Sequence, residues 1–590
     1  MSHQELQSIL LIIVLAFGTS IQKSTESSSS YRAAVAEFHR ASNGSFDQRI
    51  VDNLAGYKSL IQEAKQQDVD ILVFPEATLN YYSIPGNATD DDRIIALEYA
   101  TFVPDPTSRL VPCDVVDENN NYWNHNESQI MYSDFLRELS CEAKSAQLYI
   151  VVNMQEKSLC TQKGQRHKND TRPCSRDGMN LYNTNVVFDR KGAVISRYRK
   201  FNLFLEPGVN TTYKAERTTF HTDFGVRFGH FICFDIMFHD PAEFMVRTGV
   251  TDFVFSTMWF SQMPFLTAIQ VQESWAYAND VNLLAAGASN PAIGSGGSGI
   301  YAGHNGALVF SMSPEPVRKI IVSDVKKIIP GKKKQDEKKG HQEHSYHQDL
   351  TIPRENYPPE IMDAYRISTE NMSSYTSEKI YFGEFNKEIC SNDKFCCHFN
   401  ISTVELPVFD GKLTYEYRAV AYKGPRYWGD RTGDVLVCSI VSCSGAEITD
   451  CGVRYPDFLK VAPRMRFAHV KISGEFPSSQ DVLTTATSLS YSLSPLSRER
   501  LHMHRWHSSA RSHRNTITGL GNIKGHLDFA QGTVLMMEKV QVQLKGPPAD
   551  DLHTLGLFAR DYSAETGSST AMALSQTWLF FILSLSFILY

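Results

Sequence analysis

The sequence has no excess of charge of one sign and no apolar run long enough for an ordinary membrane-spanning helix. Its 590 residues carry 58 Lys and Arg against 65 Asp and Glu, a formal net charge of -7, and they contain no basic stripe. Nucleic-acid binding relies on such a stripe, so the composition argues against nucleic acid as a partner. The chain is too long for one ordinary core, and we expect more than one domain.

A short apolar run near the start of the chain resembles a secretory signal peptide. Residues 9–17 are apolar, and the small or polar residues Gly18, Thr19 and Ser20 follow, although no Lys or Arg stands before Lys23. The run is far shorter than the ~20 residues that a membrane helix needs. We therefore expect a signal peptide over residues 1–20 and exclude it from the fold.

The other end of the chain resembles a GPI-anchor signal. Residues 578–590 are apolar and uncharged, and they follow Gly567, Ser568, Ser569 and a mostly small, polar spacer. This order of features is the one that a GPI signal requires, so we expect a removed segment at 568–590 and attachment at Gly567. The alternative is a tail-anchor helix, but the apolar end would span only ~20 Å of a ~30 Å hydrocarbon core.

Asn-x-Ser/Thr sequons support export of the chain. A glycosylated protein outside the cell, held at the membrane by its GPI lipid, is therefore expected. The candidate glycosylation sites are Asn43, Asn87, Asn126, Asn169, Asn210, Asn371 and Asn400.

The 11 cysteines leave one without a partner. In an oxidising compartment the others can pair. The cysteines before Cys233 and those after it are both even sets, so Cys233 is the candidate for the free thiol. The first set is Cys113, Cys141, Cys160 and Cys174, and the second is Cys390, Cys396, Cys397, Cys438, Cys443 and Cys451.

Strands and helices alternate along residues 31–325. Apolar runs predict strands at 31–38, 70–75 and up to Cys233, and apolar residues at helical spacing predict a helix over 48–65. The strands are nearly continuous in apolar residues. This pattern predicts a layered α/β domain in which both faces of each sheet are covered.

The composition changes after this domain. Residues 326–374 begin with a tract rich in Lys and His, which predicts an exposed linker; a metal site at its histidines is the weaker alternative.

Residues 375–545 are rich in strands and cysteines, with the last strand expected at 532–544. Cys438, Cys443 and Cys451 would suggest zinc in the cytosol but favour disulfides in a secreted chain. The Ser- and Arg-rich stretch 478–515 predicts a flexible segment.

Three polar residues in the α/β domain stand where catalytic side chains are found. Cys233 ends an apolar strand, and such a turn can set a thiolate beside free backbone N–H groups. Glu76 ends another strand, at the sheet edge where α/β domains form their sites. Lys200 lies in a basic cluster before an apolar patch. Taken singly, these are more often a buried structural cysteine, a helix-start carboxylate and a surface lysine.

Taken together, they resemble a known family. Phe74-Pro75-Glu76-Ala77, Arg199-Lys200-Phe201-Asn202-Leu203-Phe204 and Ile232-Cys233-Phe234-Asp235 resemble, in chain order, the three signatures of the nitrilase superfamily of carbon–nitrogen hydrolases. Residues 233–241, 258–259, 272–278 and 296–302 are similar to its biotinidase and vanin branch. The resemblance covers most of 31–475. It implies an αββα sandwich followed by a smaller β-rich, disulfide-containing domain.

The resemblance also implies a catalytic triad. Glu76 would accept the proton of the Cys233 nucleophile, and Lys200 would donate to the oxyanion together with the backbone N–H of Phe234. Glu206 is a possible second glutamate of the family. No metal and no organic cofactor are expected, and the partner is a small-molecule amide.

The substrate is less closely defined. Vanins hydrolyse pantetheine to pantothenate and cysteamine, and biotinidases hydrolyse biotin amides; the anchor-like tail favours pantetheine. Trp259, Phe260 and Tyr301 are candidates for the pocket wall. A non-catalytic cell-surface binding module is the alternative from another class, although no triad member is missing. The sequence does not define the oligomeric state.

Overall fold

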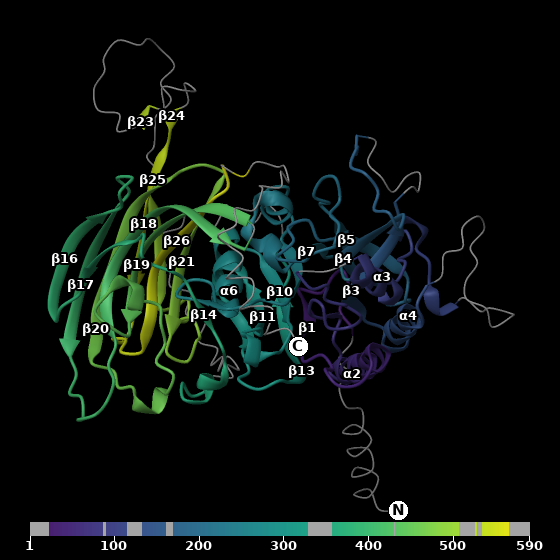
Figure 1. Cartoon of the computed structure of the whole chain (residues 1–590), viewed down its shortest axis with the longest axis horizontal. Helices are drawn as coiled ribbons and strands as arrows, with labels where there is room; N and C mark the ends of the chain where they lie inside the picture. Colours follow the sequence, from purple (N-terminus) through teal and green to yellow (C-terminus); the bar gives the residue numbers. More distant parts are fainter. Residues whose placement is uncertain are drawn as a thin grey trace, which may run out of the picture.

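The computed structural model describes residues 23–86, 90–114, 132–160, 169–328, 357–429, 431–506, 526–527, 534–563 and 565. They form an N-terminal α/β domain and a C-terminal β domain that lie side by side (Figure 1). Within these ranges, no helix is long and apolar enough to cross a membrane. The predicted signal peptide, Gly567 and the anchor signal lie outside the described residues.

Two six-stranded sheets form the centre of the first domain. Their strand orders are β13-β1-β2-β3-β4-β5 and β12-β11-β10-β8-β7-β6. The first comprises β1 (Ser30–Phe38), β2 (Ile71–Val73), β3 (Tyr149–Leu159), β4 (Met179–Phe188), β5 (Val194–Arg199) and β13 (Arg318–Lys326). The second comprises β6 (Thr219–His221), β7 (Arg227–Ile232), β8 (Asp252–Thr257), β10 (Asn282–Gly287), β11 (Ser298–Ala302) and β12 (Ala307–Ser311). Strands β1, β2 and β3 run parallel, as do β7, β8 and β10.

Alternate residues of β1 enter two different cores. Ala33 and Val35 pack between the sheets, whereas Ala34 and Ala36 pack beneath the helices. Successive side chains of a strand point to opposite faces, so a strand buried on both faces is apolar throughout.

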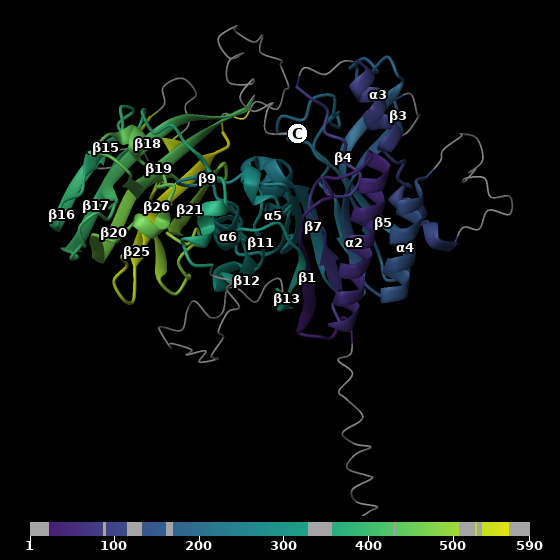
Figure 2. The ribbon, with the colours of Figure 1, turned by 60° about the horizontal axis from the view of Figure 1, so that its bottom comes forward.

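Helices cover the outer faces of both sheets. Helices α2 (Phe46–Gln66) and α4 (Asp134–Ala146) cover the first sheet, and α6 (Ala268–Asn279) covers the second (Figure 2). The shorter helices are α3 (Asp90–Tyr99) and α5 (Phe244–Arg247). This arrangement confirms the predicted αββα sandwich. Helix α2 begins at Phe46 rather than at the expected residue 48, because Ser45 caps it and accepts a hydrogen bond from the Gln48 N–H.

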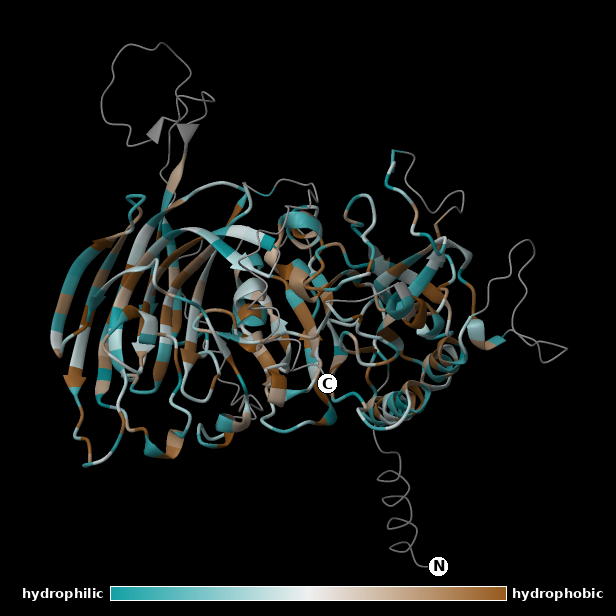
Figure 3. Cartoon of the chain, viewed as in Figure 1, coloured by the Kyte–Doolittle hydropathy of each residue, from teal (hydrophilic) through white to brown (hydrophobic). Residues whose placement is uncertain are grey.

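The C-terminal domain consists of two five-stranded antiparallel sheets. One has the order β15-β18-β19-β26-β21 and the other β16-β17-β20-β25-β22. The strands of the first are β15 (Thr376–Lys379), β18 (Glu416–Trp428), β19 (Arg431–Cys443), β21 (Val482–Ser490) and β26 (Leu552–Asp561). Those of the second are β16 (Gly383–Cys390), β17 (Cys396–Glu405), β20 (Met465–Pro477), β22 (Leu501–Trp506) and β25 (Met537–Leu544). Many of these strands alternate hydrophilic and hydrophobic residues, as expected for sheets covered on one face (Figure 3).

Three expectations about the second half of the chain are corrected. The domain continues past residue 545, because β26 lies between β19 and β21 in the middle of a sheet. The stretch 478–515 is not simply flexible over its described part, since residues 478–506 supply β21 and β22, and its last residues lie outside the described ones. The later part of the predicted linker is docked: β14 (Ser368–Thr369) pairs with β9 (Gln262–Met263) of the first domain. Pairing with strands that are distant in the sequence places these segments.

The cysteine pattern is confirmed. Five disulfides form within the two even sets, and Cys233 is the free cysteine. The pairs are Cys113–Cys141, Cys160–Cys174, Cys390–Cys396, Cys397–Cys438 and Cys443–Cys451.

The sequons within the described residues lie at or near the surface. Asn43, Asn169, Asn371 and Asn400 are exposed. Asn210 is half-buried, and its side-chain oxygen accepts hydrogen bonds from Arg93 and from the Leu181 N–H. Asn87 and Asn126 lie outside the described residues.

Candidate active site

Cys233 is the residue at which a strand becomes a helix. Strand β7 ends at Ile232, and the 3₁₀ helix η3 (Cys233–Met237) begins at Cys233, which has a φ of 47°. A left-handed backbone at a non-glycine residue costs on the order of 1–3 kcal/mol and is typical of functional turns. The first N–H groups of a helix have no acceptor within it, and Phe234 contributes one of them.

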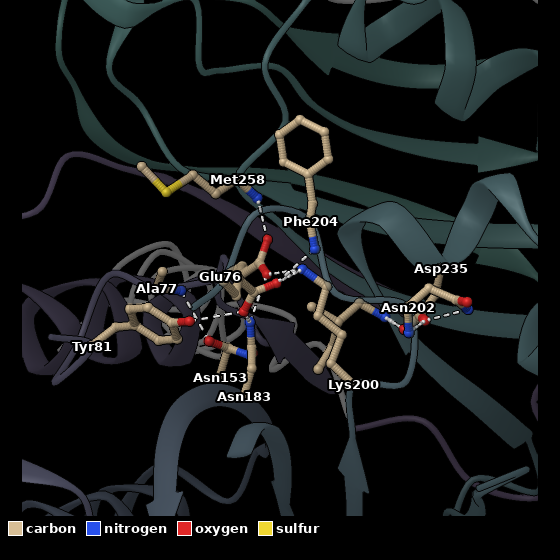
Figure 4. A network of polar contacts seen from close by, with 12 residues as sticks. Glu76, Ala77, Tyr81, Asn153, Asn183, Lys200, Asn202, Phe204, Asp235 and Met258 are labelled. Carbon is tan, nitrogen blue, oxygen red and sulfur yellow. Dashed lines mark hydrogen bonds and ion pairs between the residues drawn. The ribbon is translucent and has the colours of Figure 1, made fainter. Parts of the chain in front are cut away.

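Glu76 follows β2, and three donors fix its carboxylate. Its Oε1 accepts hydrogen bonds from Lys200 Nζ at 2.7 Å and from Asn183 Nδ2 at 2.8 Å. Its Oε2 accepts one from the Met258 N–H at 2.8 Å, just beyond β8 (Figure 4). Both oxygens are therefore held, and the orientation of this buried group is defined.

Lys200 lies between two carboxylates. Its Nζ is 2.7 Å from Oε1 of Glu76 (Figure 4), and it is 2.5 Å from Oε1 of Glu206. Burial disfavours the charged ammonium, but Glu206, Glu76 and Cys233 outweigh it and raise the pKa of Lys200 well above its usual value. The side chain is therefore a permanent buried cation.

Glu206 is held as firmly as Glu76. It accepts hydrogen bonds from Tyr81 Oη at 2.8 Å, Asn183 Nδ2 at 2.8 Å and the Phe204 N–H at 3.2 Å. Burial disfavours its charge, but Lys200, with the hydrogen bonds from Asn183 and Tyr81, lowers the pKa of Glu206 from its usual value. The structure thus places the possible second glutamate on the ammonium of Lys200.

The Cys233 thiol lies in the same group. Burial, and then the charge and hydrogen bonding of Glu76, raise the pKa of this thiol above its usual range, whereas Lys200 and the Thr257 hydroxyl lower it. The site therefore holds a protonated thiol beside the Glu76 carboxyl group and the Lys200 cation. Glu76, Lys200 and Cys233, which lie far apart in the sequence, are brought together.

Two asparagines that had no role in the sequence analysis orient the carboxylates. Asn153 Oδ1 accepts a hydrogen bond from the Ala77 N–H at 2.9 Å, and Asn153 Nδ2 donates to Asn183 Oδ1 at 2.7 Å. The Asn183 amide nitrogen is thereby turned toward both Glu76 and Glu206. An asparagine inside an apolar strand was the available signal, because a buried amide needs partners.

Asp235 links the Lys200 segment to the Cys233 turn. Its Oδ1 accepts hydrogen bonds from the backbone and side-chain nitrogens of Asn202, each at 2.9 Å. Its Oδ2 accepts from the Ile232 N–H at 3.0 Å and from Tyr198 Oη at 2.7 Å. Burial raises the pKa of Asp235 to about 6, although these donors oppose the shift.

The predicted pocket-wall residues have different positions. Phe260 is 37% exposed, and its ring lies 6.3 Å from that of Phe204, which packs on Phe234. Trp259 is buried and donates to the Leu266 carbonyl. Tyr301 is fully buried and donates to Gln272, so it belongs to the core rather than to an accessible wall.

The described residues bring one group of possible metal ligands together. It consists of Glu388, Cys390 and Cys396, and its two cysteines are joined in a disulfide. Sulfurs in a disulfide cannot serve as thiolate ligands, and this group carries no metal site.

Both domains of the chain match known protein families. Residues 47–303 match the carbon-nitrogen hydrolase family, and residues 365–565 match the vanin C-terminal domain. Vanin-like protein 2 of Drosophila melanogaster is 38% identical over 82% of this chain and 85% of that protein. The chain belongs to the vanin-like carbon-nitrogen hydrolases.

Relatives of this hydrolase carry two different activity names. A pantetheinase of Mus musculus is 30% identical over 73% of this chain and 78% of that protein. A biotinidase of Bos taurus is 29% identical over 68% of this chain and 73% of that protein. The family and the enzyme class are therefore established, with carbon–nitrogen bonds as the bonds cleaved.

Proposed function

We propose that this enzyme hydrolyses a linear secondary amide, pantetheine, to pantothenate and cysteamine, through a thioester on Cys233. The observation that carries the proposal is the buried ammonium of Lys200, which pairs with Glu76 and acts on the Cys233 thiol. A base, a cation and a nucleophile in one dry site are the parts that acyl transfer needs.

The first half-reaction forms the thioester. Because the thiol is protonated at rest, Glu76 takes its proton as the sulfur attacks the amide carbon. The negative charge that develops on the carbonyl oxygen is stabilised by Lys200 and by the Phe234 N–H. The C–N bond then breaks, and Glu76 returns the proton to the leaving amine, which departs as neutral cysteamine.

The second half-reaction regenerates the enzyme. Glu76, again a carboxylate, takes a proton from water as its oxygen attacks the thioester carbon. The same donors hold the second oxyanion. The C–S bond breaks, the acid is released, and the proton on Glu76 returns to the Cys233 sulfur. Glu206 keeps Lys200 in place and charged through both steps.

We further propose that the enzyme acts outside the cell, anchored by a GPI lipid at Gly567 after removal of residues 1–20 and 568–590. The five disulfides support an oxidising compartment. Glycans at Asn43, Asn87, Asn126, Asn169, Asn210, Asn371 and Asn400 belong to the same proposal.

Pantetheine is favoured over biotin amides because the anchor-like tail resembles that of vanins. The test compares a pantothenate amide with a biotin amide, using secreted protein that ends before Gly567, with Cys233→Ala as the control. Faster cleavage of the pantothenate amide, lost in the control, supports the proposal. Preference for the biotin amide would replace the substrate and leave the mechanism. No turnover of either amide by folded protein would overturn the proposed substrate class.

A further inference from the structure

A hairpin of the C-terminal domain reaches the turn that carries Cys233. Trp428 and Arg431 face each other at the end of β18 and the start of β19. The Trp428 ring lies 6.1 Å from that of Phe234, and the Arg431 guanidinium lies 4.9 Å from the ring of Phe238. A Cβ on Gly429 would lie only 2.9 Å from the Leu205 side chain, so the hairpin and the Lys200 segment are in close contact.

Arg431 is hydrogen-bonded into the site. Its Nη2 donates to Oδ1 of Asn202 at 3.0 Å. Asn202 in turn donates to Asp235 and, through Nδ2, to the Asp240 carbonyl at 2.8 Å. Asp235 accepts from the Ile232 N–H, next to Cys233. A continuous path of hydrogen bonds therefore runs from the C-terminal domain to the nucleophile turn.

This path joins two segments that come from different sheets. Lys200 directly follows β5 of the first sheet, and Cys233 directly follows β7 of the second. The relative position of the two sheets sets the distance between the cation and the thiol, and a misplacement of ~1 Å can cost ~10²-fold in rate. Asn202 stands two positions after Lys200. It keeps the Lys200 segment in place against the Cys233 turn only while hydrogen bonds fix the orientation of its side-chain amide.

A second arginine of the C-terminal domain holds the other end of η3. Arg560 Nε donates to the carbonyl of Met237 at 2.9 Å, and its guanidinium lies 5.1 Å from the Trp428 ring. The helix that begins at Cys233 is thus contacted near both ends by one domain.

We propose that Arg431 is a positioning residue for amide hydrolysis. Through Asn202 and Asp235 it fixes the Lys200 segment against the Cys233 turn, so the C-terminal domain completes the geometry of the active site. This inference rests on the proposed function for its kinetic readout.

The test is a double-mutant cycle in the full secreted chain, with the better of the two amides as substrate. The variants are Arg431→Met, Asn202→Ala and the double variant. The control is Arg466→Met, which removes an exposed arginine of the same domain that pairs with Asp550. We expect Arg431→Met to lower kcat by at least about tenfold with KM within about threefold, and Arg466→Met to change neither. The double variant should match Asn202→Ala within about twofold, because Arg431 acts through Asn202.

Two results would overturn the inference: a kcat for Arg431→Met equal to that of Arg466→Met, or losses of the two single variants that multiply in the double variant. Far-ultraviolet circular dichroism and thermal unfolding confirm the fold of each variant. If Arg431→Met does not fold, Arg431→Lys keeps the charge with a shorter donor and should show an intermediate loss of kcat; a wild-type kcat would count against the inference.

A wild-type enzyme that cleaves neither amide would refute the proposed substrate class and still permit a test. The rate of Cys233 alkylation by chloroacetamide needs no substrate, and it depends on the position of Lys200 relative to the thiol. Arg431→Met should change that rate by at least about threefold relative to Arg466→Met. Equal rates would overturn the positioning role.

Discussion

The ammonium nitrogen of Lys200 lies 2.7 Å from Oε1 of Glu76, and both side chains are almost completely shielded from solvent, at 2% and 5% exposure. Each charge compensates the desolvation of the other, and Glu206 supplies a second negative partner. Such a pair is costly to break, because removal of one member leaves the other buried and uncompensated. The pair is therefore both a structural element and the charged part of the proposed catalytic machinery.

Lys200→Met should damage both stability and activity. Glu76 and Glu206 would remain buried with no cation between them, so we expect a loss of about 3–5 kcal/mol in the free energy of unfolding. The rate should fall by at least ~10²-fold, because the oxyanion loses its charged donor. Lys144→Met is the control, since its ion pair with Asp114 is exposed, and it should cost under about 1 kcal/mol. Urea denaturation and amide hydrolysis report the two effects; similar values for both variants would contradict this account.

Native, non-reduced protein should be alkylated at Cys233 alone. The raised pKa of the thiol means that its thiolate fraction is small at neutral pH and grows about tenfold per pH unit. The alkylation rate should therefore rise steadily from pH 7 to pH 9 without a plateau. Peptide mass spectrometry after iodoacetamide treatment identifies the site. Labelling of a different cysteine, or a plateau below pH 7, would show that the thiol environment is not the one described.

Glu206→Gln should change the acid sensitivity of the protein. The folded-state pKa of Glu206 lies below its unfolded value, so this carboxylate contributes stability that is present above its unfolded pKa and lost as the pH falls through the folded value. The glutamine variant should be less stable at pH 7 and should lose less stability between about pH 5 and pH 3 than wild type. Urea denaturation across this range measures the free energy of unfolding of both proteins. If the two free energies fall in parallel as the pH is lowered, the lowered pKa of Glu206 in the folded protein is refuted.

The disulfides should differ in their contribution to stability. Cys397–Cys438 closes a loop with a sequence separation of 41, against 6 for Cys390–Cys396. Chain-entropy estimates give about 4 kcal/mol for the longer loop and about 2 kcal/mol for the shorter one. The double alanine variant of the first pair should therefore unfold at lower denaturant concentration than that of the second. The reverse order would mean that interactions in the folded protein, rather than the loop entropy of the unfolded chain, determine the contribution of each disulfide.

The candidate triad came from the resemblance of three short motifs to the nitrilase superfamily, and local patterns supported two of its members. Glu76 and Cys233 stand at the ends of apolar strands, and cysteine parity separated Cys233 from the paired cysteines. Strands that were apolar on both faces predicted a layered α/β domain, and the resemblance implied that its layers form an αββα sandwich.

Other features depend on contacts that no local pattern records. Asn183 orients two carboxylates only because the pairing of β3 with β4 brings it beside Asn153. Tyr301 is an aromatic residue of a kind that often lines pockets, but its position in β11 directs its side chain into the core. The role of Arg431 arises from the packing of one domain on another, and its sequence neighbourhood is an ordinary hairpin.

The most direct test of the central claim is to trap the acyl group on the enzyme. Rapid acid quenching during turnover of the pantothenate amide, followed by peptide mass spectrometry, should find pantothenoyl mass on the peptide that contains Cys233. Cys233→Ala should show neither the adduct nor turnover. Acyl mass on another residue, or turnover that persists in Cys233→Ala, would contradict the account.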